Sequence, residues 1–149
     1  MAELRIREME NSDIEAVMEI DEKIFNTPWN KRIFDYEINE NKFAHYFIVE
    51  TNQTIIGYIG LWIVYEDAQI TNVAILEDYR GYKIGEHLFG YAVQYAQNQG
   101  AERLSLEVRV SNKIAQNMYE KFGLVPAGIR EKYYTDDNED ALVMWVDLI

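Results

Sequence analysis

A β-type run, a glycine-bearing turn and the longest helical pattern of the chain follow one another. The run Asn72 to Ile75 ends a predicted strand over 68–75, and Gly81 and Gly85 follow it. From residue 84 to residue 99 apolar residues recur at helical spacing, and Gly100 supplies a left-handed stop. A turn of this kind at a helix start leaves backbone N–H groups unpaired, and the helix dipole adds positive potential there. The segment therefore predicts a site for a pyrophosphate or a similar anion.

The two glycines have a simpler interpretation as well. Gly81 and Gly85 fit a plain strand-to-helix turn, and two glycines alone do not separate that role from anion binding. Neither a Walker A sequence nor a GxGxxG fingerprint is present, so nucleotide hydrolysis and dinucleotide binding lose their main support.

The rest of the pattern predicts a mixed α/β domain in which strands and helices both recur. A capping-box signature, Ser12 with Glu15, predicts the start of the first helix, and Gly123 predicts the end of the last. Strands are expected at 4–7, 46–49, 55–64, 68–75, 104–110, 125–134 and 141–147, and helices at 12–25, 31–40, 84–99 and 113–122.

Composition limits the classes of protein that fit. A chain of 149 residues suits one domain, and the absence of cysteine removes disulfides and thiolate chemistry. The net charge of −12 disfavours nucleic acid and anionic membranes as partners. It suits a basic protein or an amine, although solubility alone also accounts for it. No targeting or membrane-spanning segment is recognised, so we expect a cytoplasmic protein, as a monomer or weak dimer.

The strand and loop described first resemble the acetyl-coenzyme A motif of the GNAT N-acetyltransferases. Their loop reads Arg/Gln-x-x-Gly-x-Gly/Ala; Arg80 and Gly85 match its ends, whereas Lys83 stands where the middle glycine is usual. Lys83 still offers a backbone N–H, provided that its conformation needs no positive φ angle. The resemblance implies acetyl-coenzyme A as co-substrate, with no metal. It assigns cofactor binding to Val73, Ala74, Ile75, Gly81, Tyr82, Lys83, Ile84, Gly85 and Glu86.

Further segments resemble the bacterial ribosomal-protein-alanine N-acetyltransferases, the RimI family. These segments are 28–29, 106–109, 111–112, 118–124, 133–134 and 139–141, so the resemblance spans nearly the whole chain. It implies a single GNAT-like α/β (α+β) domain over residues 1–149, with a mixed central sheet of about six to seven strands and about four helices.

The same resemblance implies that Glu107 is the general base and Tyr119 the general acid, and that Asn112 contacts the cofactor. The chemistry fits, because an α-amino group with a pKa of about 7.7 to 8.0 must lose a proton before it attacks a thioester. A tyrosine O–H can then protonate the departing thiolate. From the residues alone, Glu107 is a polar strand residue, Tyr119 an amphipathic helix residue, and Asn112 a helix N-cap.

Aromatic residues are the candidates for the acceptor side. Trp29, Tyr133 and Tyr134 suit a peptide entrance that is partly apolar and partly wet, although packing is an alternative for each. His45 and His87 stand alone, so we predict no metal site and no triad. We expect the acidic turn 136–139 to be solvated.

These inferences predict direct acetyl transfer to a protein N-terminal amine, most specifically the N-terminal alanine of a small-subunit ribosomal protein. Two alternatives remain. The first is an acetyltransferase for a small amine such as a polyamine or an aminoglycoside. The second is a non-catalytic sensor of acetyl-coenzyme A, in which Lys83 marks a decayed loop.

Overall fold

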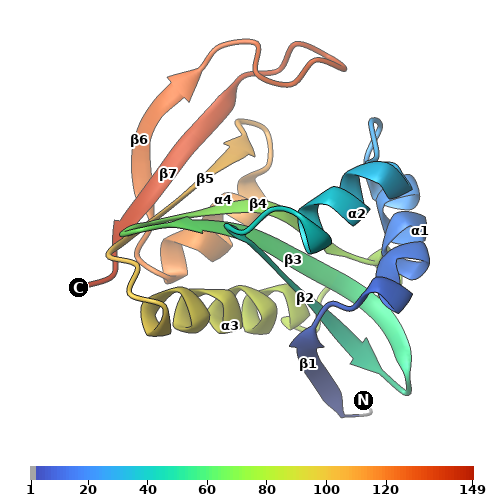
Figure 1. Cartoon of the computed structure of the whole chain (residues 1–149). Helices are drawn as coiled ribbons and strands as arrows, with labels where there is room; N and C mark the ends of the chain where they lie inside the picture. The colour runs from blue at the N-terminus through green and yellow to red at the C-terminus, as the bar shows by residue number, and fades with distance from the viewer. Residues whose placement is uncertain (1–2) are drawn as a thin grey trace. The chain divides into compact units, whose positions relative to one another are not determined.

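The computed structural model describes residues 3–149, which contain seven strands and four α-helices (Figure 1). The elements are β1 (Leu4–Glu8), α1 (Ile14–Ile24), α2 (Lys31–Asn39), β2 (Ala44–Thr51), β3 (Thr54–Val64), β4 (Asp67–Ile75), α3 (Ile84–Asn98), β5 (Arg103–Arg109), α4 (Lys113–Lys121), β6 (Val125–Arg130) and β7 (Ala141–Asp147). The strand order is β1-β2-β3-β4-β5-β7-β6, and both parallel and antiparallel pairs occur. The predicted mixed α/β fold is confirmed.

The chain forms two compact units. The first contains the residues up to Trp62 together with Thr71–Ala92, and the second contains Ile63–Ile70 together with Val93–Ile149. In the first unit β1 pairs with β2, and β2 pairs with β3, both antiparallel. Asn52 and Gln53, with φ of 50° and 63°, make the turn between β2 and β3. Positive φ at both central residues suits the twist of a two-residue hairpin.

The core of the first unit lies between the β2–β3 hairpin and two helices. Buried side chains reach it from α1 (Val17), α2 (Phe34), β2 (Ile48), β3 (Tyr58) and β4 (Ala74). Figure 1 shows α1 and α2 packed side by side next to this hairpin. These contacts explain the helical spacing of the apolar residues in 14–24, because that spacing puts them on one face of α1.

The second unit is built on β5, which pairs in parallel with the start of β4 and antiparallel with β7; β6 completes the sheet as the edge strand. Leu104, Leu106 and Val108 are buried and alternate with more exposed residues, as the sequence predicted. Gly100 and Gly123, with φ of 91° and 90°, end α3 and α4 in the left-handed conformation that was expected.

The predicted capping box of Ser12 and Glu15 is wrong. Helix α1 begins at Ile14 after a short 3-10 turn, and Asp13 is its N-cap residue. The Asp13 carboxylate accepts a hydrogen bond from the Glu10 backbone N–H at 2.8 Å and two from Arg7 at 2.7 and 2.9 Å. The hydrogen bonds from Arg7 lower the pKa of Asp13, although burial opposes that change.

The last predicted strand boundary also differs from the structure. A strand was expected over 125–134, but β6 ends at Arg130, and Lys132 has a φ of 51°. Left-handed backbone at Lys132 breaks the extended conformation that a strand requires. Residues 131–140 instead form a loop that leads from β6 to β7.

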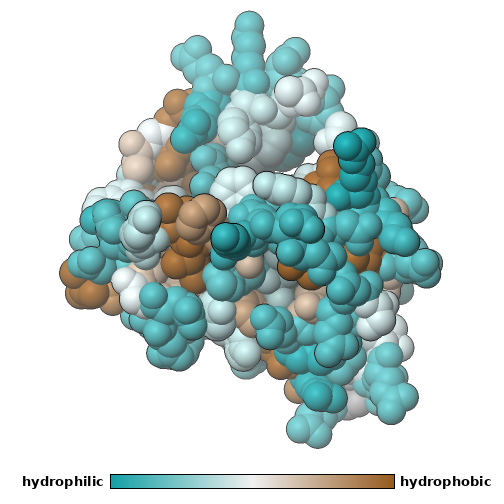
Figure 2. All heavy atoms as spheres, viewed as in Figure 1, coloured by the Kyte–Doolittle hydropathy of each residue, from teal (hydrophilic) through white to brown (hydrophobic). Residues whose placement is uncertain are grey.

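The described residues contain no helix that is long and apolar enough to cross a membrane. Within residues 3–149 there is also no group of three or more His, Asp or Glu side chains that could hold a metal ion. The face drawn in Figure 2 is mostly hydrophilic, with small and separate hydrophobic areas.

Candidate active site

The predicted anion loop lies in the first unit, between β4 and α3. Gly81 has a φ of 90°, and an added Cβ there would meet nothing within 4 Å. The Lys83 carbonyl accepts a hydrogen bond from the His87 N–H at 3.1 Å, so Lys83 directly precedes the first helical turn. The first-turn N–H groups of an α-helix have no acceptor within the helix, and those at the start of α3 lie where this loop ends. This backbone fits an anion such as a pyrophosphate.

Lys83 was expected to fit the loop only if its backbone needs no positive φ angle. The structure does not meet this condition. The φ of Lys83 is 62°, a left-handed conformation that glycine adopts freely and that costs another residue about 1 to 2 kcal/mol. The loop thus keeps the backbone shape of a glycine at this position and carries a lysine side chain there. Arg80, at the start of the motif, donates from Nε to the Ile75 carbonyl at 3.1 Å and so ties the loop to the end of β4.

A buried carboxylate in the first unit, which was not predicted from the sequence, accepts a hydrogen bond from the backbone N–H of Trp29. Asp21 on α1 is 1% exposed and accepts hydrogen bonds from the Tyr58 hydroxyl at 2.5 Å and the Trp29 N–H at 3.3 Å. The Asn72 side-chain amide donates to the Tyr58 hydroxyl at 3.4 Å. Burial raises the pKa of Asp21. One network therefore joins the predicted acceptor residue Trp29 to the start of the predicted cofactor run, Asn72 to Ile75.

A signal for Asp21 was present in the sequence. It shares the apolar face of α1 with Ile14, Val17 and Ile24, at helical spacing. A carboxylate on an apolar face predicts a buried polar network, because an unpaired buried charge is costly.

Glu107 lies on β5 in the second unit, and its side chain is only 11% exposed. Gln69 on β4 donates from Nε2 to Glu107 Oε2 at 3.0 Å. Arg130 at the end of β6 forms an ion pair with the other carboxylate oxygen, with Nε 3.2 Å from Oε1. The simple alternative of a solvated strand residue therefore does not describe Glu107, whose two oxygens are held by different strands.

Tyr119 and Asn112 belong to α4 and its start. Tyr119 is 4% exposed, and burial raises its pKa to about 12, with a smaller contribution from Tyr134. The hydroxyl therefore keeps its proton at neutral pH. Asn112 is the predicted N-cap, because its Oδ1 accepts a hydrogen bond from the Ala115 N–H at 3.1 Å.

Arg109, at the end of β5, organises the loop between β6 and β7. Its guanidinium donates to Asp136 at 2.9 and 3.0 Å, to Asp137 at 2.9 Å and to Glu139 at 3.2 Å. Its Cζ also lies 4.0 Å from the centroid of the Tyr134 ring. The expectation that the acidic turn is merely solvated is wrong, because three of its carboxylates bind one arginine.

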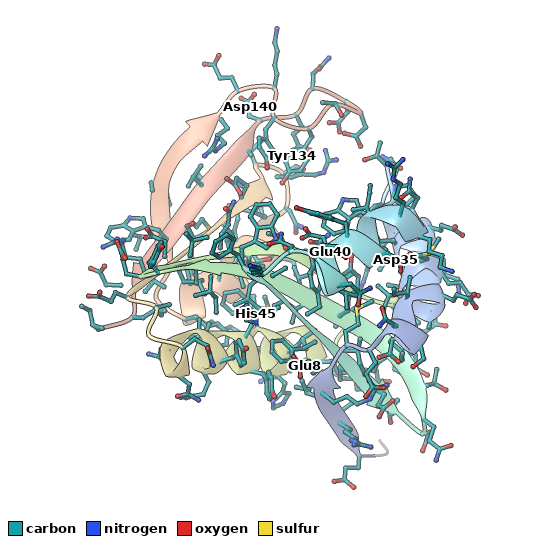
Figure 3. The ribbon with its side chains drawn as sticks, viewed as in Figure 1. Glu8, Asp35, Glu40, His45, Tyr134 and Asp140 are labelled. Atoms are coloured by element: carbon teal, nitrogen blue, oxygen red, sulfur yellow. The ribbon has the colours of Figure 1, made fainter. Side chains whose placement is uncertain are left out.

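Tyr133 and Tyr134 are adjacent in this loop, and their rings meet edge to face with centroids 5.1 Å apart. Figure 3 shows Tyr134 in the loop that also carries Asp140. Burial raises the pKa of Tyr134 to about 12, and the nearby Arg109 opposes that change. Burial, then the negative charge of Glu107, raises the pKa of Tyr133, whereas Arg130 lowers it. Tyr133 therefore senses the charge of both members of the Glu107–Arg130 pair.

The sequence analysis did not find Gln69, Arg130 or Arg109 as parts of this arrangement. Gln69 and Arg130 lie 38 and 23 positions from Glu107, and only the register of β4, β7 and β6 brings them together. The four acidic residues that follow Tyr134 offered the one usable signal for Arg109, because a dense acidic turn attracts a cation.

Comparison with known proteins gives a family with the same chemistry as the predicted site. Residues 14–124 match the acetyltransferase (GNAT) family. The chain is 52% identical over 143 residues to a protein of Bacillus subtilis described as a putative ribosomal protein bS18-alanine N-acetyltransferase, covering 96% of this chain and 95% of that one. It is 30% identical over 141 residues to the ribosomal protein bS18-alanine N-acetyltransferase of Escherichia coli, covering 93% and 94%.

Solved structures agree with the sequence matches. The crystal structure of the ribosomal-protein-S18-alanine N-acetyltransferase from Escherichia coli superposes with a TM-score of 0.89 at 28% identity, and covers 98% of this chain and 94% of that one. Ard1 from Thermoplasma volcanium shares the fold with a TM-score of 0.87 at 24% identity, over 98% of both chains.

Proposed function

The chain belongs to the acetyltransferase (GNAT) family, and on that premise we propose that it acetylates the N-terminal α-amino group of a protein. The proposed donor is acetyl-coenzyme A, and the proposed acceptor is the N-terminal alanine of ribosomal protein bS18, the substrate in the names of two relatives. The observation that carries the proposal is Glu107, a nearly buried carboxylate that Gln69 and Arg130 hold on β5.

The residues assigned to the cofactor suit its chemical groups. The loop Gly81 to Glu86 offers backbone N–H groups and the positive end of α3 to the pyrophosphate. Val73, Ala74 and Ile75 would lie beside the acyl-bearing arm, with backbone N–H groups as candidates to polarise the carbonyl. Asn112 would add a side-chain contact. Acetyl-coenzyme A supplies the acetyl group in activated form, as a thioester.

Proton transfers complete the proposed reaction. Glu107 takes a proton from the acceptor's ammonium, which frees the nitrogen lone pair to form the new C–N bond. As the C–S bond breaks, Tyr119 gives its proton to the departing sulfur, and the second proton that the nitrogen loses as the amide forms restores the Tyr119 hydroxyl. Trp29, Tyr133 and Tyr134 would line the path of the acceptor peptide. Because the amine nitrogen attacks the thioester directly, no covalent bond to the protein is required.

The proposal extends to the whole chain. Residues 1–149 would act as one N-acetyltransferase domain, in the cytoplasm and as a monomer or weak dimer. The net charge of −12 supports a basic acceptor protein, because opposite charge speeds the encounter of two proteins.

Initial rates with matched acceptors test the proposal. Hexapeptides that differ only in a first residue of alanine, serine or methionine are compared with a polyamine and an aminoglycoside, and thiol release is measured. The alanine peptide is expected to have the highest kcat/KM. Turnover of small amines alone would contradict the proposal, and acetyl-coenzyme A binding without turnover of any amine would favour a sensor.

Two substitutions separate the assigned roles. Glu107→Gln is expected to lower kcat about 10²- to 10⁴-fold without weakening acetyl-coenzyme A binding, since only the proton acceptor is lost. Tyr119→Phe is expected to slow thiol release. Glu120→Gln on the exposed face of α4 is the matched control and should retain wild-type rates. Unchanged rates in both test variants would show that the roles are wrongly assigned.

A further inference from the structure

The cation that pairs with Glu107 stands on the most exposed strand of the second unit. β6 is an edge strand of the sheet, all six of its residues are exposed, and Arg130 is its last residue. Among residues 3–149, its ion pair with Glu107 is the one salt bridge recorded for Arg130. The arginine is therefore tied to the rest of the unit through the carboxylate of the proposed base.

The register of three strands explains how the two side chains meet. Glu107 on β5 lies opposite Val143 on β7, which in turn lies opposite Gly128 on β6. Arg130 follows Gly128 by two residues, so Glu107 and Arg130 project from the same face of the sheet. The arginine reaches across β7 to make its contact, and nothing lies within 4 Å of an added Cβ at Gly128. The pair thus depends on one long side chain rather than on adjacent backbone.

The two partners of this ion pair differ in exposure. The Glu107 side chain is 11% exposed, whereas that of Arg130 is 59% exposed. An ion pair with so exposed a partner changes the equilibrium between the paired and the separated side chains by a factor of only about two to five. Gln69 donates to the other carboxylate oxygen, Oε2, which Arg130 does not use. The Arg130 end of the pair is therefore weakly held, while the carboxylate itself stays in place.

We propose that Arg130 is a displaceable counter-ion that occupies, at Glu107, the position taken by the acceptor's ammonium. This inference rests on the proposed function of Glu107. The exchange replaces one cation by another and breaks no covalent bond; Glu107 then takes the proton as described above. Both charges of the pair affect the pKa of Tyr133, so the pair lies near a residue that is assigned to the proposed acceptor path. Arg130 therefore competes with every acceptor and selects for those whose amine arrives as a cation.

Steady-state kinetics with the alanine peptide test the inference at saturating acetyl-coenzyme A. R130Q is expected to lower the peptide KM about two- to fivefold, since it removes the competing cation, with kcat and the acetyl-coenzyme A KM unchanged. R130K keeps a cation and should return the peptide KM to the wild-type value. The matched control is R103Q on β5, where Arg103 is 45% exposed and pairs with Glu66 and Asp67. It removes the same charge and should leave the peptide KM unchanged.

Several outcomes would overturn the inference. A peptide KM that rises in R130Q would mean that Arg130 binds the acceptor instead of occupying the position of the acceptor's ammonium at Glu107. An unchanged KM would mean that the pair does not compete, and an equal fall in R103Q would reduce the effect to net charge. In each of these cases the wild type still acetylates the peptide. Failure of the proposed function is a different result, in which the wild type neither turns over nor binds the peptide.

Discussion

Two arginines flank one alanine in the second unit and have opposite surroundings. Arg109 on β5 and Arg130 on β6 both lie opposite Ala141 of the intervening β7. Arg109 contacts three carboxylates and an aromatic ring, and 30% of its side chain is exposed. Arg130 pairs with one carboxylate among residues 3–149 and is 59% exposed. Both arginines lie opposite the same residue of β7. Arg109 nevertheless fixes a loop, whereas Arg130 is proposed to be exchangeable.

The largest expected effect comes from removing the more enclosed arginine. Arg109→Gln leaves Asp136, Asp137 and Glu139 close together without their shared cation, so each repels the others. We expect the free energy of unfolding to fall by about 1 to 3 kcal/mol, measured by urea denaturation at neutral pH. If the free energy of unfolding fell by no more than it does in R130Q, the two arginines would contribute equally to stability, which would contradict the comparison.

Acidification should remove part of that difference. Hydrogen bonds with Ser111, and less so with Arg109, hold the pKa of Glu139 below its ordinary value of 4.5. A carboxylate whose pKa is lowered by folding contributes stability above its unfolded pKa and loses it as the pH falls through the folded value. The gap in melting temperature between wild type and R109Q should therefore be constant above pH 5.5 and narrow below pH 4.5. A gap that widens on acidification would contradict this account.

The Tyr134 ring gives a smaller test of the same cluster. Tyr134→Leu removes the face that Arg109 covers at 4.0 Å, a contact worth about 0.5 to 1 kcal/mol at a partly exposed site. Tyr133→Leu is the matched control, since both substitutions break the contact between the two tyrosine rings. Unfolding free energies should therefore be lower for Tyr134→Leu than for Tyr133→Leu. Equal losses would assign the whole effect to the ring pair.

Much of the fold could be predicted from the sequence because its signals are local. The helix α3 follows from apolar spacing and Gly100, and β5 follows from the alternation of Leu104, Leu106 and Val108. One failure arose where a distant residue decides. The predicted strand over 125–134 ends early, and the loop that replaces it folds around Arg109, more than 20 positions earlier in the chain.

The candidate site divides in the same way. Sequence resemblance singled out Glu107, Tyr119 and the loop Gly81 to Glu86, and the structure adds what surrounds them. The partners of Glu107 could not be inferred, because Gln69 and Arg130 reach it only through the register of separate strands. The left-handed conformation of Lys83 likewise could not be predicted from the residue itself, because lysine favours negative φ.

The smallest expected effect is the one that defines the exchangeable arginine. Arg130→Gln should change the free energy of unfolding by no more than about 0.5 kcal/mol, because β6 keeps its backbone pairing with β7 and Gln69 still holds Glu107. R103Q, which removes an equally charged exposed residue, sets the scale in the same urea titration. If R130Q were as unstable as R109Q, Arg130 would be fastening β6 to the sheet. If Arg130 held β6 to the sheet, its side chain could not leave Glu107 when an acceptor binds. The stability and the kinetics of R130Q together therefore decide whether the two arginines differ.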